Sequence, residues 1–216
     1  MVQGTIIFLN GTSSAGKTTL AHALQDLLPE PYIHVALDQF RDGMPARFRG
    51  LNAPVGTDGE RGLNVVPVNE SGSPFTLVRF GETGKKMLRG MRRAIVAMVN
   101  EGNNVIIDDI ILEPEFLDDY LDAFEGLRVY FVGVRCPLDV INEREKSRPG
   151  RFPGTALGHF ETCHSHGVYD AEVDTSVTLP DECAREVYRV IKSSPPHAFA
   201  RLFAMRQREL AGIGQT

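Results

Sequence analysis

Residues 11–18 combine residue types that can bind a phosphate chain at the spacing that such binding needs. Their sequence, GTSSAGKT, matches the phosphate-binding loop G-x-x-x-x-G-K-[ST]. Backbone N–H groups of the loop and of the following helix would form a nest of positive partial charge for a polyphosphate. We expect Lys17 to reach the outer phosphates and the Thr18 hydroxyl to face a magnesium ion.

The flanking sequence fits this interpretation. Residues 5–10 form a short apolar run with β-branched residues, and apolar residues recur at helical spacing after the loop. A strand, a loop and a helix are the setting that the motif requires, which argues against a chance match in a glycine-rich turn. The predicted nucleotide contacts here are Gly11, Thr12, Ser13, Ser14, Ala15, Gly16, Lys17, Thr18 and Thr19.

Two adjacent acids, Asp108 and Asp109, close the strand-like run that begins at Asn104. Ligands of open parallel sheets bind beyond the carboxyl ends of the strands, so we expect these acids near the terminal phosphate of a nucleotide. An aspartate at this place holds the magnesium ion, directly or through water. Either acid could serve. Asp108 continues the strand and is the better metal candidate, and the unused acid would cap the next helix.

Asp38 follows the apolar run 33–37 and suggests a different role. Phosphoryl transfer to an alcohol needs an acceptor for the hydroxyl proton, and a carboxylate beside the attacking oxygen can take it. We therefore expect Asp38 to act as the general base. Magnesium ligation and capping of a helix that starts near Gln39 are the alternatives.

Arginines cluster after the strand-like run 128–134. Arg135 follows that run, and Arg144 and Arg148 lie four residues apart before a Pro-Gly break. We expect a lid over about 144–155, whose guanidinium groups neutralise the transferred phosphoryl group and exclude water. Glu145 alternates with the basic residues, so a salt-bridged, solvated helix is the alternative.

Two histidines, His164 and His166, lie close together beyond this region. Residues two apart on a helix point to different sides, and no cysteine or acid at a suitable spacing supports them as metal ligands. We expect no metal site here, and a place beside the acceptor is the alternative.

The alternation of strands and helices predicts how these residues are positioned. Strand-like runs lie at 5–10, 32–37, 104–108, 128–134 and, more weakly, 173–179, and helical patterns at about 82–101, 114–124, 137–147, 181–192 and 197–210. Such alternation implies right-handed βαβ units. We expect a single α/β domain over residues 1–216, with a mainly parallel five-stranded sheet and helices on both faces.

Residues 41–81 break the alternation and are rich in Gly, Pro and Asn. Two β-like pieces, Leu63–Val68 and Phe75–Phe80, favour a hairpin. Long excursions in compact domains are usually functional or disordered, so we expect this insertion to cover the acceptor. A surface insertion without function is the alternative. The last helix, about 197–210, would pack onto the domain or onto a second copy, as in a homodimer.

The composition limits the classes of partner. The chain has 23 basic and 28 acidic residues, a net charge of −5, which argues against a nucleic-acid or acidic membrane surface. No apolar run reaches the roughly 20 residues that span a bilayer. Three cysteines without a C-x-x-C pair indicate neither a disulfide framework nor a zinc site. We expect a cytoplasmic protein.

Several segments together resemble chloramphenicol 3-O-phosphotransferase and its relatives. In chain order they are Phe8-Leu9-Asn10 with GTSSAGKT, LPEP at 28–31, Asp38, Met44-Pro45, VIIDD at 105–109, VGVRC at 132–136 and YDAEVDTS at 169–176. They are spread through most of residues 4–192. LPEP, VGVRC and the last segment make the resemblance much more specific than the loop alone.

The resemblance implies a three-layer P-loop kinase of the adenylate-kinase-like fold. It also implies ATP with Mg²⁺ as the phosphoryl donor and a hydroxyl group of a small molecule as the acceptor. The general-base role falls on Asp38, the phosphate contacts on the 11–18 loop and the lid roles on the Arg135–Arg151 region. Asp174 and Thr175 would lie near the adenine.

Two regions depart from the resemblance. The 41–81 region is longer than expected, and the tail after about 193 looks additional. We therefore predict an ATP-dependent phosphotransferase whose acceptor is open, with antibiotic resistance and metabolism both open as its role. The alternatives are a sugar or nucleoside kinase of the same superfamily, or a nucleotide-dependent regulatory ATPase. No N-K-x-D stretch is present, which disfavours a GTPase.

Overall fold

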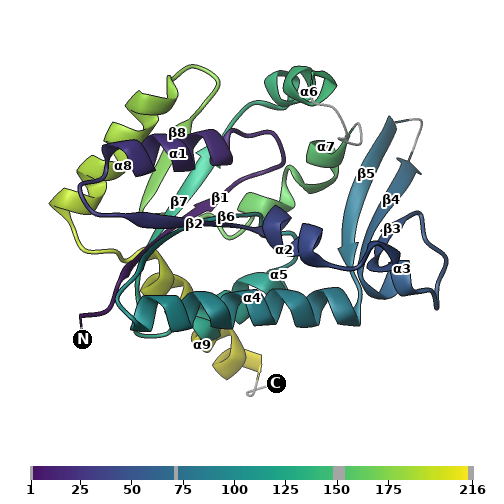
Figure 1. The fold of residues 1–216 in the computed structure, drawn as a ribbon, viewed down its shortest axis with the longest axis horizontal. Helices are drawn as coiled ribbons and strands as arrows, with labels where there is room; N and C mark the ends of the chain where they lie inside the picture. The colour runs from purple at the N-terminus through teal and green to yellow at the C-terminus, as the bar shows by residue number, and fades with distance from the viewer. Residues whose placement is uncertain (1, 71–72, 148–153, 214–216) are drawn as a thin grey trace.

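The computed structural model describes residues 2–70, 73–147 and 154–213. Its main sheet has five strands, all parallel, in the order β2-β6-β1-β7-β8 (Figure 1). The bounds are β1 Thr5–Asn10, β2 Tyr32–Ala36, β6 Asn104–Asp109, β7 Arg128–Arg135 and β8 Ala171–Asp174. The predicted five-stranded parallel sheet is confirmed.

Helices cover both faces of this sheet. Successive residues of β1 alternate between the faces, so Ile6 and Phe8 join one apolar cluster whereas Ile7 and Leu9 join the other. The first face is covered by α4 Glu82–Asn100, α5 Pro114–Ala123 and α9 Ala198–Ile213, and the second by α1 Lys17–Leu27 and α8 Pro180–Ser193 (Figure 1). Burial on both faces explains why the strands are continuously apolar.

The carboxyl ends of the central strands meet at one edge. The register pairs Ala36 with Asp108 and Asn10 with Asp109. The short elements that follow the strands at this edge are α2 Leu37–Gly43, α6 Leu138–Lys146, α7 Thr155–His159 and η2 Thr162–His164. Side chains that are distant in sequence are therefore brought together here.

The insertion forms a second, smaller sheet. The predicted hairpin is confirmed, with β4 Leu63–Glu70 antiparallel to β5 Ser73–Phe80. A third strand, β3 Arg49–Leu51, pairs in parallel with β4 and was not expected. The short helices η1 Ala46–Phe48 and α3 Asp58–Arg61 were not expected either. Figure 1 shows this sheet beyond one end of α4, apart from the main sheet.

The weak strand expected near 173–179 starts two residues earlier and is shorter than expected. Strand β8 covers Ala171–Asp174, and a turn follows it. The Asp174 carboxylate accepts hydrogen bonds from the backbone N–H and the hydroxyl of Ser176, at 2.8 and 2.6 Å. Such a side-chain bond to the backbone two residues later ends the strand in an Asx turn, which an apolar pattern does not reveal.

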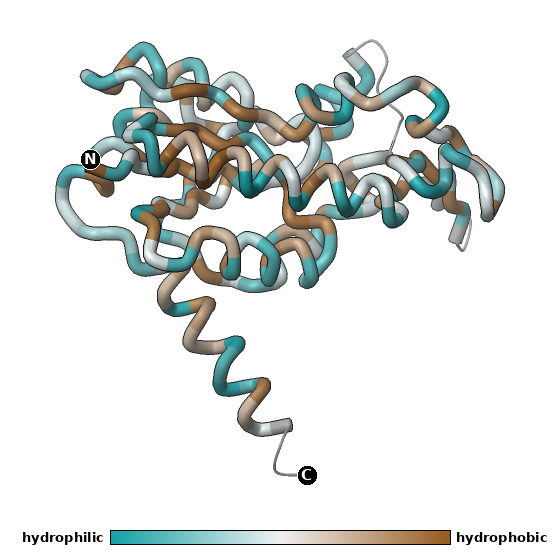
Figure 2. The backbone as a smooth tube through the Cα atoms, turned by 60° about the horizontal axis from the view of Figure 1, so that its bottom comes forward, coloured by the Kyte–Doolittle hydropathy of each residue, from teal (hydrophilic) through white to brown (hydrophobic). Residues whose placement is uncertain are grey.

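Helix α9 packs onto its own domain. Leu202 is buried in the core, and the Phe199 ring lies 6.2 Å from the Phe8 ring and 5.3 Å from the Phe131 ring, centroid to centroid. The Asp170 carboxylate accepts two backbone N–H groups at the start of this helix, at 2.6 and 3.0 Å. The far end of the helix projects from the body (Figure 2). Within the described ranges, no helix has the length and apolar character needed to cross a membrane.

Replacing Phe199 with alanine should lower the free energy of unfolding by about 2–3 kcal/mol, because a partly buried ring in contact with the core is lost. Leu210 lies on the same helix and is 58% exposed. The matched change Leu210→Ala should alter the free energy of unfolding by less than about 0.5 kcal/mol. Urea denaturation measures both. A Phe199→Ala variant as stable as the native protein would contradict this packing.

Candidate functional site

The loop between β1 and α1 presents hydroxyl groups that the described protein atoms do not satisfy. The Oγ atoms of Thr12, Ser13 and Ser14 are buried there without a hydrogen-bond partner. Buried polar groups are nearly always hydrogen-bonded, so this set indicates a polar ligand. Gly16 has a φ of 92° and Ser14 a φ of 61°, in a left-handed region that a serine adopts at a cost. The loop fits a bound polyphosphate.

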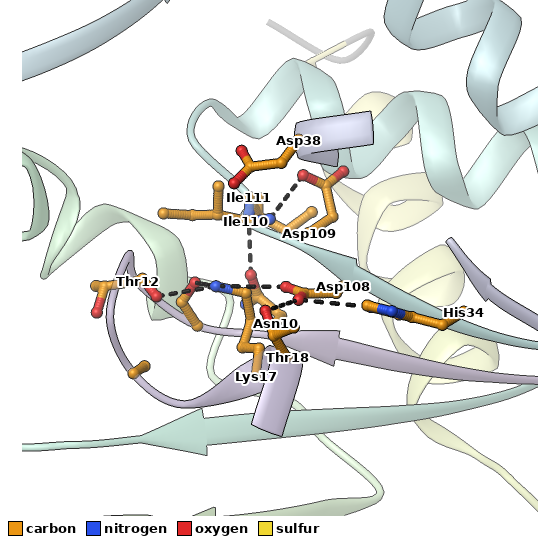
Figure 3. A network of polar contacts seen from close by, with 12 residues as sticks. Asn10, Thr12, Lys17, Thr18, His34, Asp38, Asp108, Asp109, Ile110 and Ile111 are labelled. Atoms are coloured by element: carbon orange, nitrogen blue, oxygen red, sulfur yellow. Dashed lines mark hydrogen bonds and ion pairs between the residues drawn. The ribbon is translucent and has the colours of Figure 1, made fainter. Parts of the chain in front are cut away.

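Lys17 folds back over this loop. Its Nζ atom donates hydrogen bonds to the carbonyl oxygens of Gly11 and Thr12, both at 2.9 Å, and lies 3.7 Å from Oδ1 of Asp108 (Figure 3). The ammonium charge is therefore held above the loop by short contacts. That Lys17 meets the outer phosphates stays a prediction.

Asp108 points toward the same loop. Its Oδ2 accepts a hydrogen bond from the Thr18 hydroxyl at 2.6 Å and lies 3.6 Å from Nε2 of His34 (Figure 3). Burial disfavours the charged carboxylate, but Lys17, His34 and Thr18 more than offset this and lower its pKa below the usual range. A charged carboxylate beside a threonine hydroxyl is a donor set that suits a magnesium ion carried by phosphates.

Asp109 lies on the opposite face of the strand. Its carboxylate accepts hydrogen bonds from the Tyr120 hydroxyl at 2.5 Å and from the backbone N–H of Ile110 at 2.7 Å. Burial raises the pKa of Asp109. The two acids therefore do not converge on the loop, contrary to our expectation. The alternation of faces could have separated them, because Ile106, two residues before Asp108, belongs to the cluster that packs against α1.

Asp38 lies two residues beyond the end of β2, within the first turn of α2. Asp38 was expected directly after the strand, but it lies inside the helix that follows. The Gln39 side chain, and not Asp38, accepts the N–H of Ala36 at 3.0 Å. Nη1 of Arg41 lies 2.6 Å from Oδ1 of Asp38, and the Asp38 side chain is 44% exposed. Figure 3 shows Asp38 at the same sheet edge as Asp108.

Arg144 links α6 to the loop and to the turn after β8. Its guanidinium group donates to the carbonyl oxygen and the hydroxyl of Thr175 at 2.7 and 3.1 Å, and to the carbonyl oxygen of Ser14 at 3.4 Å. The Thr175 hydroxyl in turn donates to the carbonyl oxygen of Ala15 at 2.7 Å. These bonds tie α6 and the turn after β8 to the loop.

The other predicted arginines differ in their surroundings. Nε of Arg135 lies 2.6 Å from Oε2 of Glu172, and its guanidinium group lies 5.6 Å from the centre of the Tyr169 ring. Its charge is thus already paired, which the sequence did not reveal. Arg148 and part of the predicted lid lie outside the described residues. The alternative of a salt-bridged, solvated helix is wrong at Glu145, which is buried.

A cavity of about 470 Å³ lies beside the loop. Thr19, Arg144, Thr175, Val177 and Leu179 are among the residues that line it. Its volume and its mixture of apolar and hydrogen-bonding groups suit the base and sugar of a nucleotide. Thr175 lines this cavity, whereas the Asp174 side chain bonds within the turn described above, and the nucleotide contacts of both residues stay predictions.

Sequence reasoning missed a network around Asn10, the last residue of β1. The Asn10 side-chain amide donates to the carbonyl oxygen of Cys163 at 2.6 Å and to the Tyr169 hydroxyl at 2.7 Å, and its oxygen accepts the N–H of Ile111 at 2.9 Å. The Tyr169 hydroxyl also shares a hydrogen bond of 2.5 Å with Nδ1 of His164. The sequence signal was an asparagine that ends an otherwise apolar strand.

Comparisons with known proteins identify the family of this chain. The family model described as "Chloramphenicol phosphotransferase-like protein" matches residues 4–192. "Putative O-phosphotransferase Rv2636" of Mycobacterium tuberculosis (strain ATCC 25618 / H37Rv) is 37% identical over 213 residues, which cover 94% of this chain and 89% of the relative.

Solved structures share the fold at low identity. The Mycobacterium tuberculosis APS kinase CysC in complex with AMPPNP and APS is 18% identical, with a TM-score of 0.61, covering 89% of this chain and 100% of that one. A gluconokinase from Sinorhizobium meliloti 1021 is 18% identical, with a TM-score of 0.54, covering 96% and 98%. The fold is that of the P-loop kinases, and the family match shows a phosphotransferase.

Three largely buried histidines with lowered pKa values should make the stability of the fold depend on pH. Burial lowers the pKa of His159 and of His166 to about 4, and that of His164 to about 3. The unfolded chain takes up these protons near pH 6.5, before the folded chain does. Stability is therefore fully present above pH 6.5 and is lost as the pH falls toward 4.

The change His159→Gln should reduce the stability lost between about pH 7.5 and pH 5 by about 2 kcal/mol, since one of these titrations is removed. Glutamine can still accept the N–H of Val78, which Nε2 of His159 accepts at 2.9 Å. The change His22→Gln, at an exposed position of α1, should leave the loss as in the native protein. Urea denaturation at both pH values measures this loss. An equal loss in the two variants would contradict the assignment to His159.

Proposed function

The chain belongs to the chloramphenicol phosphotransferase-like family, and we propose that it transfers the γ-phosphoryl group of ATP to a hydroxyl group of a small molecule. The observation that carries this proposal is the meeting of Lys17, Thr18 and Asp108 at the sheet edge where Asp38 also lies. On this proposal, a phosphate site and a candidate proton acceptor would share one end of the sheet.

Nucleotide binding would use the loop and the cavity beside it. The unpartnered hydroxyls of Thr12, Ser13 and Ser14, with the backbone N–H groups of the loop, would hold the phosphates. Arg144 and Thr175 would form the wall of the base and sugar site. Excluding water from this site matters, because an enzyme that transfers a phosphoryl group to an alcohol must not transfer it to water.

Thr18 and Asp108 would hold the magnesium ion, directly or through water. Bound there with the phosphates, Mg²⁺ would neutralise their charge and orient the terminal phosphoryl group. Lys17, which already lies 3.7 Å from Asp108, would move its Nζ from the loop carbonyls to the phosphate oxygens. Asp109, bonded to Tyr120, would keep the turn after β6 in place.

Asp38 would act as the general base. The Arg41 contact orients its carboxylate, which could then accept the proton of the attacking hydroxyl group. The hairpin β4–β5 would cover the acceptor. Arg135 would reach the transferring phosphoryl group only after leaving its ion pair with Glu172. Arg148 would act as a lid residue, a role that rests on the sequence.

The acceptor class is a hydroxylated small molecule. The family description points to chloramphenicol, and the relative's description points to an oxygen acceptor. The buried cysteines Cys136, Cys163 and Cys183 are free thiols, which suits a reducing compartment such as the cytoplasm.

Mass spectrometry of a panel of alcohols incubated with the protein and Mg·ATP tests this function. Chloramphenicol, related hydroxylated antibiotics, sugars and nucleosides form the panel. We expect one class to gain a single phosphoryl group. Release of inorganic phosphate at the same rate with every compound, with no phosphorylated product, would favour a regulatory ATPase instead.

Replacing Asp38 with asparagine should lower turnover roughly 10²–10⁴-fold and leave AMPPNP affinity nearly unchanged, because the proton acceptor is lost. Asp42 is the matched control, since it also contacts Arg41, with its Oδ1 2.9 Å from Nε. Asp42→Asn should keep most of the activity. Steady-state kinetics on the acceptor that the screen identifies would contradict a base role if both variants turned over equally.

The adjacent acids of β6 should respond differently to the same change. Asp108→Asn should weaken Mn²⁺ binding in the presence of AMPPNP by at least roughly tenfold, because a metal ligand or the partner of its water is lost. Asp109→Asn should leave this affinity nearly unchanged and lower the free energy of unfolding by about 1–3 kcal/mol. Electron paramagnetic resonance titration and urea denaturation measure the two effects. The reverse pattern would assign the metal to Asp109.

A further inference from the structure

Glu145 is a buried carboxylate with an unusual set of partners. It is 6% exposed, and its two oxygens accept the backbone N–H groups of Gly154 and Ala156 at 3.1 and 3.0 Å. Among the described residues no cation pairs with it. A buried carboxylate is costly unless it is hydrogen-bonded. The two hydrogen bonds of Glu145 hold the backbone at the start of α7.

Helix α7 in turn is seated on the hairpin. The N–H of Thr76 donates to the carbonyl oxygen of Gly154 at 3.1 Å, and the N–H of Val78 donates to Nε2 of His159 at 2.9 Å. A Cβ atom at Gly158 would lie 2.4 Å from the carbonyl oxygen of Thr76, so only glycine allows this approach. Figure 1 shows α7 between α6 and β5. Anchoring α7 therefore anchors β5.

Arg144, the residue before Glu145, points away from α7 and toward Thr175. Arg144 bonds to Thr175 and to the carbonyl oxygen of Ser14 and lines the cavity assigned to the nucleotide. Two adjacent residues at the end of α6 therefore hold the nucleotide side of the site and the hairpin side. A ligand that fixes Arg144 also fixes the backbone that carries Glu145.

We infer that Glu145 is a positioning residue that couples the nucleotide cavity to the hairpin β4–β5. Nucleotide binding would restrict α6 through Arg144, and Glu145 would pass this restriction through α7 to β5. The inference rests on the proposed function, in which this cavity takes the nucleotide and the hairpin covers the acceptor. It follows that the hairpin β4–β5 would take up its position over the acceptor site after the nucleotide binds.

Hydrogen exchange with and without Mg·AMPPNP tests this coupling without an acceptor. In the native protein, AMPPNP should slow exchange in peptides that contain Thr76 and Val78 by about fivefold or more, the lower end of typical coupling between sites. The Glu145→Gln variant has an amide nitrogen that cannot accept an N–H. AMPPNP should bind this variant with nearly native affinity but slow exchange in these peptides by less than about twofold, below the fivefold expected for coupled sites.

Glu143→Gln is the matched control, because Glu143 is exposed on the same helix and its carboxylate pairs with the Lys146 side chain. It should behave as the native protein. Native-like slowing in Glu145→Gln, or bound AMPPNP without slowing in the native protein, would overturn the inference. Failure of the native protein to bind AMPPNP, measured by calorimetry, would overturn the proposed function and the inference with it. Thermal melting of Glu145→Gln above the assay temperature establishes that the variant is folded, and Glu145→Asp, which keeps both acceptor oxygens, should restore part of the slowing.

Discussion

The site depends on the contact between the end of β6 and the start of α1, where Asp108 meets Thr18 and Lys17. A buried carboxylate is costly, and here a lysine ammonium group and a threonine hydroxyl stabilise its charged form. The same three groups are those that a phosphate chain with its metal ion requires. Parallel strands with a shared carboxyl edge make the contact possible, because the register of β1 against β6 brings the loop beside Asp108.

Neighbouring residues take different tasks here because adjacent side chains of one element point in different directions. Asp108 faces α1 and the loop, whereas its neighbour Asp109 faces Tyr120 and the core under α4 and α5. Arg144 and Glu145 repeat this division at the end of α6, one toward Thr175 and the other toward Gly154. In both pairs, one side chain lies at the proposed ligand site and the other accepts a hydrogen bond from the surrounding backbone.

Much of the fold was predictable because local signals agreed with the global arrangement. The apolar runs, the loop motif and the helical periods all indicated one parallel α/β sheet, and the hairpin was marked by its own β-like pieces. The start of α2 was expected near Gln39 but lies two residues earlier, at Leu37, because the Gln39 side chain caps the helix through a local bond. The extent of β8 was missed because an Asx turn at Asp174 ended the strand.

The site was less predictable than the fold. Residue types nominated the loop, Asp38 and the acids of β6, since their chemistry is local to each motif. The pairing of Arg135 with Glu172 and the burial of Glu145 depend on tertiary contacts between segments far apart in the chain or on backbone N–H groups, which leave no mark in the residue pattern. Polar residues that contact backbone atoms are the class that sequence reasoning overlooked here.

The central claim is that the phosphate-binding loop and Asp38 face each other across one phosphoryl group in this phosphotransferase. A crystal structure with ADP, Mg²⁺ and fluoroaluminate measures that arrangement directly. The account predicts the fluoroaluminate in contact with Lys17, with the Asp38 carboxylate on its far side and within roughly 3 Å of the apical oxygen or of one bridging water. A fluoroaluminate bound at the loop with Asp38 turned away, beyond the reach of a single water, would contradict it.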